Sequence, residues 1–365
     1  MASFVHSADI HLDTPFSANL SSKQMQMRRK EIMQTFKKLV QASADKDFLF
    51  LCGDIFDGGY VSSDTIEFVK RCFSEIPDTK VFISAGNHDP LAGDSAYKSG
   101  NFGDNVHIFG SRMEYIDFPE LKTRIHGVSF ADARQEATLL EGLEIKEEWC
   151  NILVIHGDVV ADGGESVYNP LEKGALASCG ADYVALGHIH IASGLQRAGN
   201  TWYAYSGVPD GRGFDEEGEK GFYTGEAEKG RVHIEWVPAS SRAFYHTNVD
   251  VSGVKDSIEL YEKIKEEIID EKNLYKVILS GKARRGLINT EVLKEQLNDS
   301  AFYIDVIDKT RLGYEIEEIA KENSLRGAFA REMLEKISLL PEEEKEIGYM
   351  ALEFGLSAME GGECK

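Results

Sequence analysis

The sequence has few cysteines, a shortage of basic residues and no long apolar run. Its 5 cysteines are scattered and never form a C-x-x-C pair, which argues against a disulfide framework or a zinc knuckle and favours a reducing, cytoplasmic location. The longest apolar runs, such as 48–52 and 152–155, are far shorter than the roughly 20 residues that span a bilayer. The N-terminus has no basic stretch followed by a long apolar segment, so we expect neither a secretory signal nor membrane association.

Basic residues are outnumbered: 40 lysines and arginines stand against 62 aspartates and glutamates, for a formal net charge of −22. Such a surface repels phosphate backbones at long range, which disfavours a role in coating nucleic acid. A phosphate-containing substrate would therefore need local help from metal ions or from a basic patch. The dense basic clusters lie at 28–30 and 282–285, and each could guide DNA or form an ordinary solvated face.

Up to about residue 248, short apolar runs alternate with helical patterns. Strands are predicted at 4–6, 48–52, 81–84, 151–155 and 183–186. Helices are predicted at about 23–46 and after a cap at Ser62 or Ser63. This alternation indicates an α/β sheet, in which functional groups gather beyond the strand ends.

After about residue 249 the pattern changes to a smaller α/β unit and then to a helical tail. We predict helices near 258–268 and 291–297 and strands at 275–279 and 302–307. The predicted domains are therefore 1–248, the small α/β unit at 249–310, and the C-terminal helices at 311–365.

The tail is predicted to contain a helix capped by Ser324 and a last helix opened by Pro341. The apolar face of the last helix is predicted to consist of Ile347, Met350, Ala351 and Phe354. These helices could dock a partner helix or pack on their own second domain.

Polar clusters follow the predicted strands of the first domain. They contain Asp9, His11, Asp54, Asp57, Asn87, His88, His156, His188 and His190. A mixture of carboxylates, one amide and several imidazoles suits borderline divalent ions such as manganese, iron or zinc. Two metals need a bridging ligand, which Asp54 supplies most easily, and paired ions clamp the attacking and leaving oxygens of a phosphoryl displacement.

In this order, the motifs resemble those of the calcineurin-like metallophosphoesterases. The motifs are D-x-H at 9–11, G-D-x-x-D at 53–57, G-N-H-D at 86–89, H-G at 156–157 and G-H-x-H at 187–190. The extended opening with Asp13 and the glycine-rich stretch 207–221 are most similar to SbcD-type DNA repair nucleases, in particular their YhaO-like bacterial branch. The resemblance covers roughly residues 1–240 and extends only loosely into the tail.

The resemblance implies a four-layer α/β metallophosphoesterase sandwich, with the small α/β domain and the C-terminal helices added to it. It implies one metal on Asp9, His11, Asp54 and His190, and a second on Asp54, Asn87, His156 and His188. Manganese is the expected ion, with iron or zinc as alternatives. His88 would protonate the leaving oxygen or stabilise the transition state, and Asp57 would orient His88.

Other residues have competing interpretations. His126-Gly127 is a second H-G pair, but we prefer His156 because it follows a fully apolar strand and leads into Asp158. Arg212 could contact a substrate phosphate or be an ordinary exposed loop arginine. The remaining histidines are expected to be structural or surface residues: His6, His107, His233 and His246.

The leading hypothesis is a two-metal phosphodiesterase that acts on DNA as an SbcD/YhaO-like repair exonuclease. The resemblance also suggests an SbcC-like ATPase as the partner that the tail could dock, with packing on the second domain as the alternative, and it allows a homodimer. One alternative is a phosphatase or a small-molecule phosphodiester hydrolase, which the net charge favours. A protein phosphatase is disfavoured, because that subfamily looks to need Asp-Arg-Gly at this motif. In this sequence Asp57 is followed by Gly58-Gly59 instead. A further alternative is a partner-dependent scaffold for the ATPase.

Overall fold

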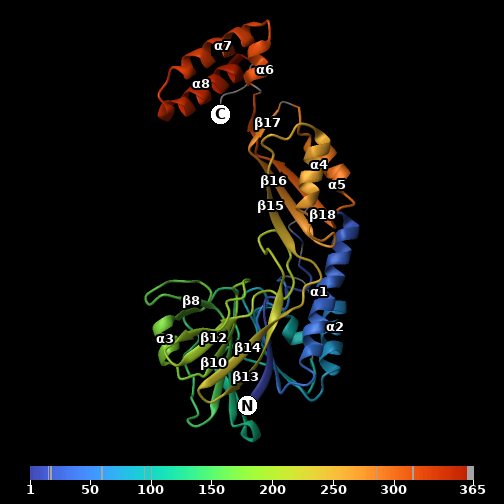
Figure 1. The fold of residues 1–365 in the computed structure, drawn as a ribbon. Helices are drawn as coiled ribbons and strands as arrows, with labels where there is room; N and C mark the ends of the chain where they lie inside the picture. The colour runs from blue at the N-terminus through green and yellow to red at the C-terminus, as the bar shows by residue number, and fades with distance from the viewer. Residues whose placement is uncertain are drawn as a thin grey trace. The chain divides into compact units, whose positions relative to one another are not determined.

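A computed structural model describes residues 1–14, 16, 19–58, 61–93, 95–99, 101–284, 286–314 and 316–359. Residue contacts divide the chain into two compact units, 1–244 and 245–365, whose elements are labelled in Figure 1. Of the sequence features named above, Gly59, Cys364 and Arg285 lie outside the described residues.

The first unit contains two mixed β-sheets. The strands of the first sheet, in spatial order, are β14 (Arg231–Pro238), β13 (Gly221–Glu228), β1 (Ala2–Ser7), β2 (Phe48–Cys52), β3 (Lys80–Ser84) and β4 (Val106–Ile108). Strands β1 to β4 run parallel to one another, whereas β13 is antiparallel to β1. The carboxyl ends of β1, β2 and β3 therefore lie side by side at one edge of this sheet.

The second sheet repeats this arrangement. Its strands, in spatial order, are β11 (Gln196–Ala198), β12 (Thr201–Tyr205), β10 (Tyr183–Gly187), β7 (Cys150–His156), β6 (Thr123–Gly127) and β5 (Glu114–Phe118). The four central strands are parallel, so β7 and β10 also end side by side. Two short strands, β8 (Asp158–Val160) and β9 (Pro170–Glu172), form a separate parallel ladder.

The two sheets pack face to face through a buried aromatic and aliphatic core. Phe4 and Phe50 from the first sheet join Ile152 and Tyr183 from the second in one cluster. The Phe4 and Tyr183 rings stack with centroids 5.2 Å apart. Residues on the opposite faces of the same strands, such as Leu49, point to the outer cores instead, as the two-residue period of a strand requires.

Helices cover the outer faces of the sheets. Helices α1 (Ser22–Ala42) and α2 (Ser63–Ser74) lie side by side on the first sheet, and the short α3 (Lys173–Ser178) packs on the second (Figure 1). The result is the four-layer α/β sandwich expected from the sequence. The 3₁₀ segments η1 (Ala96–Ser99) and η2 (Pro119–Leu121) lie in connections between strands.

Helix α1 begins as the sequence predicts but ends earlier. Ser21 caps its start, and the Gln24 side chain accepts a hydrogen bond from the Ser21 backbone in return. The helix stops at Ala42, and the expected continuation to residue 46 is wrong. Ser43 Oγ donates to Val40 O, and the Lys46 N–H donates to Ser43 O, so a tight turn leads the chain directly into β2.

The second unit begins with a small sheet. It contains β15 (Phe244–Asp250), β16 (Leu274–Ser280) and β18 (Tyr303–Asp308), accompanied by α4 (Ser257–Glu266) and α5 (Thr290–Leu297). Strands β17 (Lys282–Ala283) and β19 (Arg311–Leu312) pair in parallel. Three helices follow: α6 (Ile316–Lys321), α7 (Leu325–Ser338) and α8 (Glu342–Met359).

The predicted apolar face of the last helix is exposed in the structure. In α8 the buried positions are Gly348, Leu352 and Leu356, which pack with Ile337 of α7. Ile347 and Phe354 are 67% and 61% exposed. Gly348 lies where a side chain would collide with Ile337, so α7 approaches α8 on the glycine side and leaves the bulkier apolar residues outside. Among the described residues, no helix is long and apolar enough to cross a membrane.

Candidate active site

The five polar clusters predicted from the sequence meet at the carboxyl ends of β1, β2, β3, β7 and β10. His156, the last residue of β7, places Nδ1 2.8 Å from the carbonyl oxygen of Cys52, the last residue of β2. The backbone N–H of His188, after β10, donates to both carboxylate oxygens of Asp9, after β1, at 3.1 Å. Side chains from both sheets therefore form one site.

The backbone at this site adopts unusual conformations. Asp9, His11, Asp54 and His188 have positive φ angles of 53°, 50°, 52° and 110°, in a region that residues other than glycine rarely enter. Each such conformation costs about 1–3 kcal/mol and persists only where the surrounding structure enforces it. The concentration of these residues at the strand ends is typical of a functional site.

Two glycines allow the loops to approach closely. A Cβ atom on Gly86 would lie 2.3 Å from Asp54 Oδ1, and one on Gly187 would lie 1.9 Å from the Cys52 carbonyl oxygen. Both distances are far below van der Waals contact. The glycines in the G-N-H-D and G-H-x-H motifs therefore make room for the polar side chains around them.

Asp9, His11 and His190 form a group whose candidate ligand atoms lie within 4.8 Å of one another. His190 Nε2 lies 4.0 Å from Asp9 Oδ1, and His11 Nε2 lies 3.9 Å from Asp54 Oδ2. Both ring nitrogens of His11 are buried and make no hydrogen bond within the described structure. A buried imidazole that makes no hydrogen bond has a ring nitrogen available to a metal ion.

Asp9, Asp54 and His156 form a second group with the same spacing. His156 Nε2 lies 3.4 Å from Asp54 Oδ2 and 2.9 Å from Asn87 Oδ1, and His188 Nδ1 lies 3.2 Å from the same amide oxygen. Because His156 Nδ1–H donates to the Cys52 carbonyl, the lone pair of Nε2 faces this group. Asn87 and His188 thus extend the second group.

The charges of these residues fit a cation. Burial, followed by repulsion from Asp54, raises the pKa of Asp9 well above its ordinary value, and burial also raises the pKa of Asp54. Burial lowers the pKa values of His11, His156 and His188 to about 4, so these imidazoles are neutral at physiological pH. Neutral imidazoles beside crowded buried carboxylates suit divalent metal ions, whose charge would relieve the repulsion.

His88 and Asp57 form a pair at the open side of the site. His88 Nδ1 lies 2.8 Å from Asp57 Oδ1, and the His88 side chain is 46% exposed. The hydrogen bond to Asp57 raises the pKa of His88. The interactions of Asp57 with His11 and then His88 hold the pKa of Asp57 well below its ordinary range. Asp57 Oδ1 also lies 3.5 Å from His11 Nδ1, so this carboxylate stands between the two imidazoles.

Asp89, the last residue of G-N-H-D, joins two of the loops. Its buried carboxylate accepts the backbone N–H groups of Ile55 and Gly86, each at 2.7 Å, and the hydroxyl of Tyr97. The sequence analysis gave Asp89 no role. Its hydrogen bonds fix the loop that carries Asp54 against the loop that carries Asn87.

Glu216 is a site residue that the sequence analysis missed. Its buried carboxylate lies 2.8 Å from His190 Nδ1 and 2.7 Å from the Arg212 guanidinium. Burial opposes ionisation, but the hydrogen bonds with His190 and Arg212 outweigh it and lower the pKa of Glu216 to about 2. The sequence feature that could have pointed to Glu216 is its position in the glycine-rich stretch 207–221.

Two arginines of the first unit pair with acidic side chains. Arg212 is not an ordinary exposed loop arginine, because its guanidinium pairs with Glu216 and lies 3.2 Å from His190 Nδ1. Arg28 does not belong to an open basic cluster: its side chain is fully buried and pairs with Asp210 at 2.6 Å and with Glu31. The spacing of apolar residues in α1 predicts a helix, but it could not predict that the distant loop containing Asp210 packs over Arg28.

The other histidines lie elsewhere. His126 is buried on β6 and lies 3.2 Å from Asn151 Oδ1, away from the groups described above. His6 contacts the Tyr183 hydroxyl, and His107 contacts Glu114.

Residues 2–192 match the family model of the calcineurin-like phosphoesterases, and the chain belongs to this family. The members of this family are metallophosphoesterases. The chain is similar to the uncharacterized metallophosphoesterase YhaO of Bacillus subtilis (strain 168), with 28% identity over 72% of this chain and 66% of that protein.

It is also similar to the DNA double-strand break repair protein Mre11 of Methanopyrus kandleri, with 24% identity over 71% of this chain and 62% of that protein. The chain thus spans slightly less than two thirds of the length of these curated relatives. Among solved structures, it matches TT1561 of Thermus thermophilus with a TM-score of 0.40 and 12% identity, over 64% of this chain and 98% of that one.

Proposed function

We propose that this protein is a two-metal phosphodiesterase that hydrolyses DNA. The observation that carries the proposal is the pair of candidate ligand groups, with the Asp54 carboxylate within 4 Å of both His11 in the first group and His156 in the second. The similarity to Mre11, whose name describes DNA double-strand break repair, supports DNA as the substrate. We propose manganese as the ion, because the mixture of carboxylate, amide and imidazole ligands suits a borderline divalent metal.

In this proposal, Asp9, His11, Asp54 and His190 hold one ion, and Asp54, Asn87, His156 and His188 hold the other. Such a pair of ions supplies Lewis-acid stabilisation of the phosphoryl oxygens and activates water. The protein residues supply orientation and proton transfer. His88, exposed at the edge of the site, donates a proton to the departing sugar oxygen, and Asp57 holds Nδ1 so that Nε2 is the donating atom.

The test is incubation of the manganese-loaded protein with end-labelled linear double-stranded and single-stranded DNA, in parallel with Asp54→Ala. We expect metal-dependent degradation by the wild type and none by a folded variant. End-labelling also distinguishes stepwise removal of nucleotides from internal cleavage. Degradation by Asp54→Ala at the wild-type rate would contradict the two-metal assignment.

The net charge of −22 favours a second candidate, hydrolysis of a small phosphodiester or phosphomonoester at the same site. Hydrolysis of bis(p-nitrophenyl) phosphate compared with p-nitrophenyl phosphate separates diesterase from monoesterase activity. Activity on a small ester together with intact DNA would support this candidate.

We also propose that α8 docks the helical base of an SbcC-like ATPase. The exposed Ile347, Met350 and Phe354 give this helix an apolar face that no described residue of the bundle covers. A double variant, Ile347→Ser with Phe354→Ser, should lose co-purification with the ATPase and keep hydrolysis of a small diester. Unchanged co-purification would contradict docking at this face.

A further inference from the structure

A pocket adjoins the candidate metal site on the side of α1. It is lined by His11, Leu12, Asp13, Thr14, Phe16, Arg29, Ile32, Met33 and Thr65. His11 therefore belongs both to the candidate metal ligands and to the wall of this pocket. A substrate whose reacting phosphate lies at His11 would have its next group within reach of the pocket.

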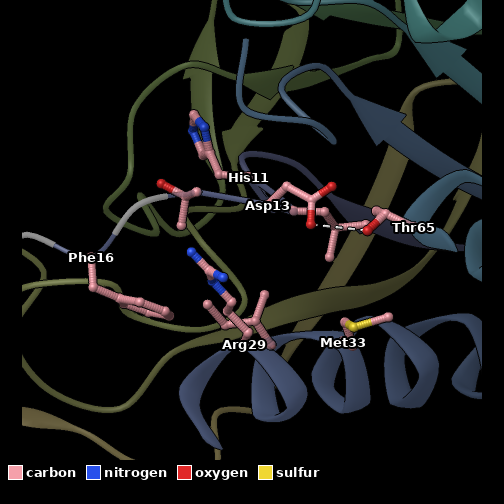
Figure 2. A pocket seen from close by; sticks show the side chains of 9 residues that line it. His11, Asp13, Phe16, Arg29, Met33 and Thr65 are labelled. Carbon is pink, nitrogen blue, oxygen red and sulfur yellow. Dashed lines mark hydrogen bonds between the residues drawn. The ribbon is translucent and has the colours of Figure 1, made fainter. Parts of the chain in front are cut away.

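The positive charge in this pocket comes from Arg29. Figure 2 shows its side chain rising from α1 toward the loop that carries His11 and toward Phe16. The one carboxylate among the lining residues belongs to Asp13, which accepts the backbone N–H of Ser62 and the hydroxyl of Thr65, each at 2.9 Å. In the part of the chain that the structure describes, Arg29 forms no ion pair, so its charge is available.

The two neighbouring arginines of the basic cluster thus have opposite roles. Arg28 is buried and neutralised by Asp210 and Glu31, whereas Arg29 is exposed in the pocket. The other arginine near the site, Arg212, is neutralised by Glu216. On a chain with a net charge of −22, a free guanidinium beside candidate metal ligands is a distinctive feature.

We infer that Arg29 binds the phosphate next to the scissile one in a phosphodiester chain. A guanidinium matches the geometry of a phosphate, and Arg29 offers one in the pocket that His11 also lines. This subsite rests on the proposed function and narrows it: the preferred substrate is a strand with consecutive phosphates, in place of a lone diester.

The first test measures binding without catalysis. Anisotropy of a fluorescent single-stranded 12-mer is followed in EDTA over a series of salt concentrations, for the wild type, Arg29→Ala and the control Lys30→Ala. Lys30 is the exposed neighbour of Arg29 on α1 and does not line the pocket. Loss of one phosphate contact should flatten the slope of log K against log salt by about 0.7 in Arg29→Ala. The slope of Lys30→Ala should equal that of the wild type.

The second test compares substrates. Arg29→Ala should lower kcat/KM on the 12-mer about tenfold, the typical value of one charge-assisted hydrogen bond. Its activity on bis(p-nitrophenyl) phosphate and on the dinucleotide TpT, which lack a neighbouring phosphate, should be unchanged. Arg29→Lys should recover part of the loss, because it keeps the charge but not the planar donor pair.

The outcomes separate the subsite from the proposed function. If the wild type degrades the 12-mer and Arg29→Ala matches it in both tests, the subsite is overturned and the nuclease stands. Equal losses in Arg29→Ala and Lys30→Ala would also overturn it, because they would indicate a diffuse charge effect. If the wild type hydrolyses the small diester but no strand, the DNA activity fails and the subsite fails with it.

Discussion

Glu216 lies 2.8 Å from His190 Nδ1, on the ring edge opposite the nitrogen that faces Asp9. A carboxylate that accepts Nδ1–H fixes the tautomer in which Nε2 carries the lone pair, and it makes Nε2 more basic. Arg212 stabilises Glu216 in its ionised form. Two side chains from the loop after β12, Glu216 and Arg212, therefore set the orientation of a candidate metal ligand from the loop after β10.

Replacing Glu216 should weaken metal binding. Glu216→Gln keeps the volume but removes the charge, and we expect manganese affinity to fall about 10-fold to 100-fold, as is typical for loss of such a supporting contact. Isothermal titration with Mn²⁺ measures the change. Asp215→Asn, at an exposed neighbouring position, is the matched control. Equal affinities of Glu216→Gln and wild type would show that Glu216 does not support His190.

The pH profile should depend on Asp57. His88 acts as an acid only while protonated, and its pKa is raised chiefly by the hydrogen bond to Asp57. Activity on a small diester should therefore fall as the pH rises through the pKa of His88. In Asp57→Asn this fall should move to lower pH, because the hydrogen bond that raises the pKa of His88 is lost.

The control for this profile is Asp132→Asn, an exposed aspartate on another loop, which should leave the profile in place. Metal content should be the same in all three proteins. If Asp57→Asn lowers the rate but the activity still falls at the same pH as in the wild type, Asp57 does not set the pKa of His88.

His126 should affect stability in acid and not metal binding. Burial lowers the pKa of His126 from 6.5 to about 4. Between pH 6.5 and pH 4, His126 is therefore protonated in the unfolded chain and neutral in the folded chain. Stability therefore decreases as the pH falls through this window, and His126→Gln should remove that contribution. Between pH 6.5 and pH 5 the wild type should lose about 2 kcal/mol more than the variant.

Urea unfolding followed by tryptophan fluorescence measures this difference. Trp149, Trp202 and Trp236 all lie in the first unit, as does His126, so the signal reports the correct part of the chain. The metal content of His126→Gln should equal that of the wild type. A loss of metal would mean that His126, and not only His156, belongs to the site.

The sequence was sufficient to predict the strands that carry the site, because apolar runs such as 48–52 end directly at polar residues. The order of the strands comes from the structure, in which β1, β2 and β3 are parallel neighbours that bring Asp9, Asp54 and Asn87 to one edge. Contacts that depend on the path of a loop could not be predicted. Glu216 and Asp210 act on His190 and Arg28 across long stretches of sequence, and no local period encodes these pairings.

The last helix shows a different limit. Ile347, Met350 and Phe354 have helical spacing, and the pattern predicts an apolar face without indicating what covers it. The side with Gly348 and Leu352 is buried against α7, because the absence of a side chain at Gly348 lets Ile337 of α7 come close. A helix with apolar residues on two sides does not reveal from its sequence which side its neighbour covers.

The most direct test of the account is the number of metal ions bound per chain. The protein, stripped with chelator and reloaded with Mn²⁺, is analysed by plasma mass spectrometry and by calorimetric titration, in parallel with Asp54→Asn. The account predicts two ions per wild-type chain and a clear loss of stoichiometry or affinity in the variant, which should remain folded. One ion or none in the wild type, or two tightly bound ions in Asp54→Asn, would contradict the two-metal site.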